Sequence, residues 1–379
     1  MDALRIGFAA EWIGEQVGGL ERYAASLARA LVALDGSERF EMFLTPRGRA
    51  ALADLAGPRV RLNAMPNNSR WYFVPVGLPW AALRARLDVL HATFGLAPWC
   101  PGSAVVLTIH DLCPDVHPAF FPAPVRARVR WLLRQGAARA DWIVTPSRAA
   151  QEELTEHYGV PAERVTVIPH GVEPALVDLA APLAAGDARA LATLPAEFVL
   201  YVGRFHARKN LPRLLAAMAR LRERRGEAVP LVLVGRDMWT ERALMAEVAR
   251  LGLTGIVHFP GYLSDGALAH CYRRARAFAF PSLHEGFGMP VLEAMAHGVP
   301  VLSSNRSCLP EVCGDAAVLV DPTDAEAIAD GLDRLLGDEA LRADLAARGP
   351  AHAAAFTWER SAIAHREVYR MLGARRAAA

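Results

Sequence analysis

Two glycine-containing loops in the sequence are placed to bind an anion. Gly18 and Gly19 separate an apolar run from a helical pattern, and the segment Glu285-Gly286-Phe287-Gly288-Met289-Pro290 precedes another helical pattern. In an open α/β sheet, ligands bind at the carboxyl ends of strands, where glycines let the backbone approach and helix N-terminal amides attract anions. The loops therefore predict a phosphate site. The alternative for each loop is an ordinary tight turn.

Two cations follow one of the buried strand patterns. Arg204 and Lys209 lie in the segment Gly203-Arg-Phe-His-Ala-Arg-Lys-Asn210, directly after Tyr201-Val202. A guanidinium can contact two oxygens while an ammonium is a mobile point charge, so together they suit a diphosphate leaving group that gains negative charge. The alternative is a pair of ordinary surface charges near a helix start.

Two acids and one histidine complete the set of candidate polar groups. Glu285 lies on the second glycine loop and Glu293 about a turn into the helix after it, and carboxylates accept hydrogen bonds from sugar hydroxyls. A glutamate early in a helix is also stabilised by the helix dipole without any function. His110 ends a strand pattern, where it could contact a sugar hydroxyl, assist proton movement, or only cap a turn.

The sequence does not favour a metal cofactor. Asp-x-Asp, the usual carboxylate pair for a divalent metal that bridges a diphosphate, does not occur. His110, Asp111, Asp115 and His117 could be read as metal ligands, but their spacing fixes no ligand geometry. We expect no cofactor, with the ligand's charge met by Arg, Lys and backbone amides.

These residues need a scaffold of strands and helices, and the sequence predicts one with α/β alternation. Short apolar runs predict strands at 5–10, 40–44, 60–63, 89–91, 104–109, 142–145 and 165–168, and again at 198–202, 231–234, 256–259, 277–280, 299–303 and 317–320. Helical patterns lie between them, beginning with Leu20–Leu34. This alternation is typical of parallel sheets covered by helices.

A composition shift divides the chain into two Rossmann-like domains. Residues 173–194 are rich in Ala, Gly and Pro and lack strand character, and they are interpreted as a linker. The N-terminal domain then covers residues 1–172 and the C-terminal domain residues 195–359. The last helix, about 360–379, could cross back onto the first domain, which periodicity alone does not decide.

Length and charge limit the class of protein. The chain has 379 residues, 53% of them hydrophobic and 22% charged, which is enough for a large core and more than one ordinary domain. Its 42 Lys and Arg residues oppose 40 Asp and Glu residues, and a net charge of +2 creates no global field that would gather nucleic acid. We expect no nucleic-acid partner.

Cysteine content and apolar runs bear on the cellular location. The five cysteines form no Cys-x-x-Cys pair, and the N-terminal residues lack the basic and long apolar regions of a secretory signal. No uninterrupted apolar run reaches the roughly 18–20 residues that span a bilayer. We expect a cytoplasmic protein, at most peripheral at the inner face of the membrane. The arginine-rich segment Arg126 to Arg139 either faces anionic lipid or is a helix with a solvated basic face.

Several motifs in order give the chain a family resemblance over nearly its whole length. It resembles the retaining glycosyltransferases of family four, the group-1 type with the GT-B fold. The motifs are Gly18-Gly19-Leu-Glu-Arg-Tyr, Thr108-Ile-His-Asp111, Thr145-Pro-Ser-Arg148, Val167-Ile-Pro-His-Gly-Val172, Tyr201-Val-Gly-Arg204 with Arg208-Lys-Asn210, and Pro281-Ser-Leu-His-Glu-Gly-Phe-Gly-Met-Pro-Val-Leu-Glu-Ala-Met295. The last contains an E-x7-E signature. His170 departs from the asparagine of many relatives.

The resemblance implies two parallel-sheet domains facing across a cleft, with the acceptor on the side of residues 1–172 and a nucleotide sugar bound by residues 195–359. It also implies a role for each candidate residue. The roles are Arg204 and Lys209 on the donor diphosphate, Glu293 on the ribose, Glu285 on hydroxyls of the transferred sugar, Gly18 and Gly19 completing the phosphate site, His110 near the donor sugar, and the backbone of Gly286, Phe287, Gly288 and Met289 on sugar and phosphate.

Within the family, the segment from His110 to Pro118 looks like bacterial mannosyltransferases that build surface polysaccharide from GDP-mannose on a glycan or lipid-linked acceptor. UDP-sugar transferases use the same scaffold and remain the alternative, as does a non-catalytic nucleotide-sugar-binding subunit. A sugar-nucleotide epimerase is disfavoured by the E-x7-E segment. A dehydrogenase is disfavoured because no G-x-G-x-x-G opens the first helix. A P-loop ATPase is excluded because G-x-x-x-x-G-K-[ST] does not occur.

Overall fold

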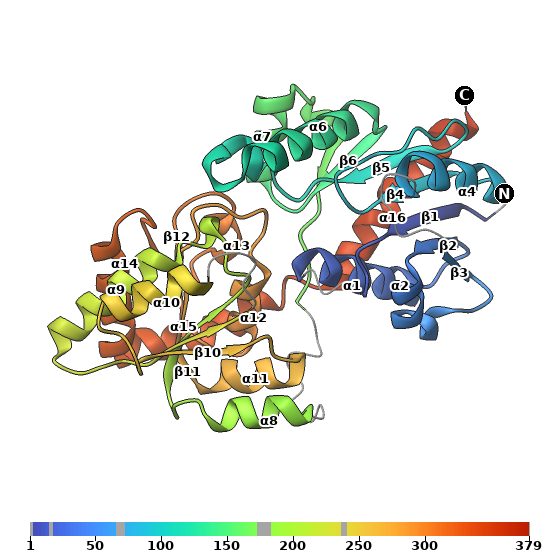
Figure 1. Cartoon of the computed structure of the whole chain (residues 1–379). Coiled ribbons are helices and arrows are strands. Elements are labelled where there is room, and N and C mark those ends of the chain that lie inside the picture. The colour runs from blue at the N-terminus through green and yellow to red at the C-terminus, as the bar shows by residue number, and fades with distance from the viewer. Residues whose placement is uncertain (1–2, 15–17, 66–72, 173–182, 236–240, 379) are drawn as a thin grey trace. The chain divides into compact units, whose positions relative to one another are not determined.

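The computed structural model describes residues 3–14, 18–65, 73–172, 183–235 and 241–378. The chain forms two compact units. The first unit consists of Met1–Gly171 and Thr357–Ala379, and the second of Val172–Phe356. Each unit contains one parallel sheet with helices on its faces, as Figure 1 shows.

The first unit contains a seven-stranded sheet in the order β3-β2-β1-β4-β5-β6-β7. Its central strands are apolar runs because both faces of the sheet are covered. The strands are β1 (Arg5–Ala10), β2 (Arg39–Leu44), β3 (Val60–Ala64), β4 (Val89–Ala92), β5 (Ala104–Thr108), β6 (Trp142–Thr145) and β7 (Val165–Val167). The strand order reverses direction at the β1–β4 pair, so the chain leaves these two neighbouring strands toward opposite sides of the sheet.

The helices of the first unit lie on two faces of this sheet. Leu90 of β4 and Leu107 of β5 share a core with residues of α4, α6 and α7, whereas α1 and α16 pack against each other, and α16 also packs on β4 and β5. The helices are α1 (Gly19–Ala33), α2 (Pro46–Ala51), η1 (Ala53–Leu55), η2 (Phe73–Gly77), α4 (Leu78–Ala85), α5 (Cys113–Val116), η3 (Pro118–Phe120), α6 (Ala123–Arg139), α7 (Arg148–Tyr158), η4 (Ala162–Arg164) and α16 (Trp358–Ala377).

The second unit contains a six-stranded sheet in the order β10-β9-β8-β11-β12-β13. The strands are β8 (Phe198–Val202), β9 (Leu231–Val234), β10 (Val257–Gly261), β11 (Ala275–Phe280), β12 (Val301–Ser304) and β13 (Ala317–Val320). The helices are α8 (Ala185–Ala192), η6 (Ala207–Lys209), α9 (Leu211–Arg225), α10 (Glu241–Arg250), α11 (Asp265–Arg274), α12 (Met289–Ala296), α13 (Leu309–Cys313), α14 (Ala325–Gly337) and α15 (Glu339–Ala353). Strand order reverses at the β8–β11 pair, where open α/β sheets bind ligands.

All of the predicted strands are present, but the predicted linker 173–194 is too long at its second end. Residues 173–182 lie outside the described part of the chain, and α8 follows at Ala185–Ala192. α8 packs on α11, and Arg274 donates hydrogen bonds to the carbonyls of Leu191 and Leu194 at 3.0 and 2.9 Å. This interval therefore belongs to the second unit, because an Ala-rich stretch with few bulky side chains can still form a packed helix.

The C-terminal helix α16 belongs to the first unit, an arrangement that periodicity left open. Gly171 lies so close to Trp358 that an added Cβ would come within 2.3 Å of the Trp358 nitrogen. The chain therefore leaves the first unit after residue 171, enters it again at residue 357, and crosses between the units at two neighbouring points.

Candidate functional site

The candidate site of the second unit lies at the carboxyl ends of β8 and β11, which are neighbours in the sheet. The loop after β8 carries Arg204 and Lys209, and the loop after β11 carries Glu285. The backbone joins the two loops, since Leu283 N–H donates to the carbonyl of Arg208 at 2.7 Å. The Asn210 side-chain amide also donates to Pro281 O at 3.0 Å. Residues far apart in the sequence therefore form one edge.

Glu285 lies at the centre of this edge and is ionised. Its carboxylate is buried, with Lys209 Nζ at 2.5 Å from Oε1 and Arg208 Nη1 in contact with Oε2. Burial alone would raise the pKa of Glu285, but the charges of Arg208 and Lys209 outweigh it and lower that pKa to about 2. Glu285 can therefore accept hydrogen bonds from hydroxyl groups at neutral pH, and it cannot serve as a general acid.

The sequence pattern did not single out Arg208, which makes the second ion pair to Glu285. Arg208 Nη1 also donates to the His284 carbonyl at 3.1 Å. Arg204 is more exposed, and partial burial together with the neighbouring charge of Arg208 lowers its pKa. Two cations thus contact one carboxylate, and Arg204 adds a third positive charge near Arg208. The excess positive charge suits an anion with several negative charges.

Lys209 is the only lysine in a chain that contains 42 Lys and Arg residues. It is also nine-tenths buried, and its ammonium lies over the ring of Phe280 at 4.5 Å from the ring centroid. Every other basic side chain is an arginine, so the compact ammonium occurs solely where it is enclosed between a carboxylate and an aromatic ring. An ammonium on a flexible stem fits such a site better than a planar guanidinium does.

The second glycine loop leads directly into α12. Gly288 has φ 93°, a conformation that favours glycine, and an added Cβ would come within 2.8 Å of Leu309 Cδ2. Gly286 and Phe287 are buried, Met289 is half-buried, and the Phe287 ring packs edge-on against Phe356 at 6.0 Å. What this loop offers a ligand is therefore backbone rather than the Phe287 side chain.

Two further hydroxyl groups support the acids, and the sequence pattern did not predict either. The Ser307 hydroxyl donates to the Glu285 carbonyl at 2.6 Å and accepts from the Glu285 N–H at 3.3 Å. The Tyr272 hydroxyl donates to Glu293 Oε2 at 2.9 Å. Glu293 is buried on α12, so this bond compensates for its burial.

The remaining predicted residues, Gly18, Gly19 and His110, belong to the first unit. Gly18 precedes α1 with φ 76° and ψ −130°, a backbone conformation suited to glycine, and both glycines are exposed. His110 follows β5 and is half-buried. The loops that carry them follow β1 and β5, so all three residues lie at the carboxyl edge of this sheet.

His110 is a neutral imidazole, and one of its ring nitrogens already makes a hydrogen bond within the protein. Its Nε2 lies 3.2 Å from the carbonyl of Thr93, and because a carbonyl only accepts, Nε2 carries the proton. Burial lowers the pKa of His110 to about 4, although the Thr93 bond and Asp111 oppose the shift. Nδ1 is then the acceptor at neutral pH, able to accept a hydrogen bond from a hydroxyl.

A buried chain of hydrogen bonds lies beside His110 and reaches α16. His365 Nδ1 is 2.7 Å from the Ser361 carbonyl, so Nδ1 carries the proton. Burial lowers the pKa of His365 to about 4, so its Nε2 is an acceptor and the Tyr23 hydroxyl donates to it at 3.1 Å. The Thr108 hydroxyl must then donate to Tyr23 at 2.8 Å.

The same reasoning fixes the other half of this chain. Thr108 can only accept from His91 Nε2, at 2.7 Å, so His91 Nδ1 accepts from the Tyr369 hydroxyl at 2.7 Å. Both ends of the chain therefore lie on α16, and it passes through Tyr23 of α1, whose ring packs edge-on against His110 at 4.7 Å. With both histidines neutral, this assignment gives each hydrogen bond of the chain one donor and one acceptor.

Asp115, one of the alternative metal ligands, is occupied by protein partners. It accepts from Arg130 Nε at 2.8 Å and from the Tyr158 hydroxyl at 2.7 Å. Asp111 accepts from the Cys113 N–H at 3.0 Å. In the described part of the chain, no group of three or more His, Cys, Asp or Glu side chains could hold a metal ion.

The arginine-rich segment from Arg126 to Arg139 lies within α6, and part of its charge is used inside the unit. Arg130 pairs with the buried carboxylate of Asp115, and Arg134 lies over the ring of Tyr158 at 5.1 Å. Arg126 donates to the carbonyl of Pro118 at 3.2 Å. No helix among the described residues is long and apolar enough to cross a membrane.

Two parallel α/β units, one of which has cations and the buried acid Glu285 at its strand edge, are the architecture of GT-B glycosyltransferases. Two family profiles match the chain: "Glycosyltransferase Family 4" over residues 17–176 and "Glycosyl transferases group 1" over residues 189–352. The chain is 34% identical over 280 residues to the O-antigen chain mannosyltransferase B of Escherichia coli, an alignment that covers 70% of each chain. The chain belongs to the group 1 glycosyltransferases of family 4.

Two further similarities agree with this assignment. The serotype-specific mannosyltransferase WbdA of Escherichia coli is 32% identical over 271 residues, which is 70% of this chain and 32% of WbdA. The structure of Anabaena Alr3699/HepE in complex with UDP and glucose matches with a TM-score of 0.74 at 20% identity, covering 97% of this chain and 100% of that protein. At that identity the structural similarity shows the fold alone.

Proposed function

We propose that this glycosyltransferase moves mannose from GDP-mannose, with retention of configuration, onto a glycan or lipid-linked acceptor in bacterial surface polysaccharide synthesis. The observation that supports mannose is the similarity to the O-antigen chain mannosyltransferase B of Escherichia coli, at 34% identity over 70% of both chains. The resemblance of the segment from His110 to Pro118 to bacterial mannosyltransferases points to the same donor.

In the proposed reaction the donor diphosphate binds at the cationic edge of the second unit. Arg204, Arg208 and Lys209 neutralise the charge that develops on the leaving group, and the N-terminal amides of α12 add to this stabilisation. The pKa of Glu285, at about 2, keeps its carboxylate charged, so that it orients the sugar by accepting from hydroxyls. Glu293, held by Tyr272, accepts from the ribose hydroxyls.

Retention is proposed to follow attack of the acceptor hydroxyl on the same face that the diphosphate leaves. The bond from the anomeric carbon to the phosphate oxygen breaks, the bond to the acceptor oxygen forms, and the released phosphate oxygen takes the acceptor proton. No protein nucleophile is then needed. His110, neutral at its lowered pKa, orients a donor sugar hydroxyl through Nδ1, while Gly18 and Gly19 complete the phosphate site.

The alternative donor is a UDP-sugar, which the UDP and glucose bound in the Anabaena protein of the same fold support. Thermal stabilisation by nucleotides separates the candidates, because a ligand that binds only the native state raises its stability. With GDP or GDP-mannose near a hundred times its dissociation constant, we expect the melting temperature to rise by about 5–10 °C. UDP, ADP and their sugars should give smaller shifts.

Each result of this titration has a definite meaning. Selective stabilisation by UDP would keep the enzyme class and reject GDP-mannose as the donor. A lack of response to every nucleotide would favour a non-catalytic subunit. Mannose transfer that persists without any stabilisation by GDP would show that the mannose comes from a donor other than GDP-mannose.

We also propose that the transfer needs no metal ion, because Arg204, Arg208 and Lys209 supply positive charge at the diphosphate. Turnover measured after dialysis against EDTA should stay within about twofold of the untreated rate, since no Lewis acid is lost. A loss of activity that added Mg²⁺ or Mn²⁺ restores would overturn this charge balance.

A further inference from the structure

Most of the large exposed apolar side chains of the first unit lie on three of its segments. On η2 and α4 they are Val76, Trp80 and Leu83, which are 51%, 62% and 66% exposed. On the loop between β4 and β5, Trp99 is 73% exposed, and on α6 Trp131 is 54% exposed. Tryptophan rings are usually buried or partnered, so three such exposed rings on one unit indicate a contact surface.

These segments cover one face of the sheet. Leu78 and Ala82 of α4 share a buried core cluster with Leu133 and Ala137 of α6, so both helices pack on the same side. The exposed residues Val76, Trp80 and Leu83 are spaced by four and three, which places them on one helical stripe opposite that core. We call the surface formed by Val76, Trp80, Leu83, Trp99 and Trp131 the tryptophan face.

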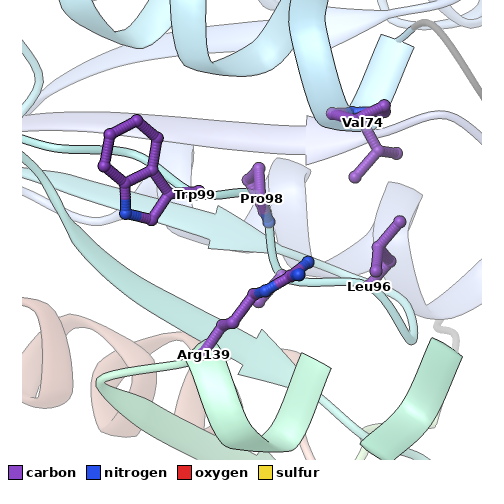
Figure 2. A pocket seen from close by; sticks show the side chains of 7 residues that line it. Val74, Leu96, Pro98, Trp99 and Arg139 are labelled. Carbon is purple, nitrogen blue, oxygen red and sulfur yellow. The ribbon is translucent and has the colours of Figure 1, made fainter. Parts of the chain in front are cut away.

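The loop that carries Trp99 connects β4 to β5 and packs against α6. Gly136 of α6 approaches this loop so closely that an added Cβ would be 2.6 Å from the Gly95 carbonyl oxygen. A cavity of about 340 Å³ lies here, lined by Val74, Pro75, Leu96, Ala97, Pro98, Trp99 and Arg139. Figure 2 shows Arg139 reaching from the end of α6 toward Leu96 and Pro98, with Val74 across the cavity.

The segments that form the tryptophan face carry several exposed arginines. Arg84 lies on α4 and Arg86 follows it directly, and both are exposed. Residues 123–139 contain five arginines and no acid. Arg84 lies over the Trp80 ring at 5.3 Å, and the exposed Arg128 and Arg134 flank Trp131 at a spacing of three residues.

We propose that the tryptophan face docks the enzyme on a bilayer that contains anionic phospholipid. Tryptophan and leucine side chains enter the headgroup region, where an amphipathic ring is most stable, while arginines contact lipid phosphates. The apolar cavity with Arg139 at its rim matches the combination of an acyl chain and a phosphate. This surface differs from the sequence-based hypothesis, because α4 and the Trp99 loop supply most of the apolar contact and α6 supplies the charge.

The test is co-sedimentation with phosphatidylcholine vesicles and with vesicles that also contain phosphatidylglycerol. The wild-type protein should bind the anionic vesicles and leave the neutral ones mostly unbound, with binding that weakens as salt rises. A variant with Trp80→Ser and Leu83→Ser should bind anionic vesicles at least about tenfold more weakly. An Arg128→Gln and Arg139→Gln variant should lose the preference for anionic lipid.

The matched control is a Met245→Ser and Tyr262→Ser variant, which removes two comparably exposed apolar side chains from the second unit. It should bind vesicles as the wild type does, and all variants should keep the wild-type melting temperature. Equal vesicle binding by both serine variants, or no binding by the wild type, would overturn the proposal. The surface does not depend on the donor, so nucleotide stabilisation of each variant separates its failure from a failure of the proposed function.

Discussion

Replacing Lys209 with methionine is expected to lower kcat/KM by about 10²–10³-fold, with most of the loss in kcat. The reason is that the ammonium meets charge that grows on the leaving diphosphate, so it stabilises the transition state more than the ground state. Methionine keeps most of the side-chain length over the Phe280 ring. Glu285 also remains paired with Arg208, so the substitution leaves no buried carboxylate without a partner.

The matched control is Arg220→Met, which removes one positive charge from α9 at an exposed ion pair with Glu326. Such pairs contribute little, so both stability and turnover should stay near the wild-type values. Near-normal turnover of the Lys209→Met variant would remove Lys209 from the diphosphate site. Loss of turnover together with a lowered melting temperature would mean that Lys209 acts on folding.

Because Lys209 is the only lysine, a second measurement observes it alone. Protein grown with isotopically labelled lysine should give one side-chain resonance in nuclear magnetic resonance spectra. That resonance should shift when the donor nucleotide binds, since the ammonium then exchanges part of its contact with Glu285 for phosphate oxygens. An unchanged resonance at saturating nucleotide would contradict the assignment without any substitution.

Lowering the pH from 7.5 to 5 is expected to destabilise the first unit strongly. His110 and His365 have pKa values of about 4, against about 6.5 in an unfolded chain, and burial is the leading cause in both. The folded state therefore binds fewer protons than the unfolded state between these values. Stability is fully present above about pH 6.5 and is lost as pH falls through about 4.

The expected loss in free energy of unfolding is a substantial fraction of the stability of an ordinary domain. A shift from 6.5 to about 4 corresponds to a loss on the order of 2 kcal/mol per histidine at pH 5, which grows to about 3 kcal/mol below pH 4. Burial also lowers the pKa values of His91 and His170. Domains are commonly stable by about 5–15 kcal/mol. Urea unfolding followed by tryptophan fluorescence measures this unit, because Trp239 is the only one of the eight tryptophans outside its range.

A His365→Gln variant is the control for this prediction. Its amide oxygen can still accept from the Tyr23 hydroxyl, but it does not titrate, so the loss of stability between pH 7.5 and 5 should be smaller than in the wild type. Nitrogen chemical shifts at pH 7.5 should show protons on His91 Nε2 and His365 Nδ1. Equal stability at both pH values, or the opposite tautomers, would contradict the hydrogen-bond chain.

The regular elements of both units follow from the sequence alone. Strands covered on both faces must be apolar along their whole length, and the runs at β5 and β8 show this pattern without any tertiary information. The alternation with helical patterns then requires parallel sheets, and parallel sheets place their loops at a carboxyl edge. Lys209 and Glu285 each follow a strand of the same parallel sheet, so the sequence alone predicts that both lie at its carboxyl edge.

Side-chain direction, in contrast, does not follow from position along the chain. Arg204 and Arg208 both follow β8, yet it is Arg208 that contacts Glu285. Arg208 lies on the short helix η6, whereas Arg204 precedes that helix. Similarly, the linker interval contains few bulky residues, and only the packing of α8 on α11 identifies its second half as part of a domain.

The sequence by itself determined the two-unit α/β architecture, the family and the strand ends that carry the candidate residues, because these depend on hydrophobic period and on local motifs. Tertiary structure alone decided which cation meets Glu285, how His91 and His365 share protons with residues of α1, β5 and α16, and that Trp80 and Trp99 face outward. The physical reason is that burial and hydrogen-bond partners depend on other segments of the chain, up to 342 residues away, which no local pattern records.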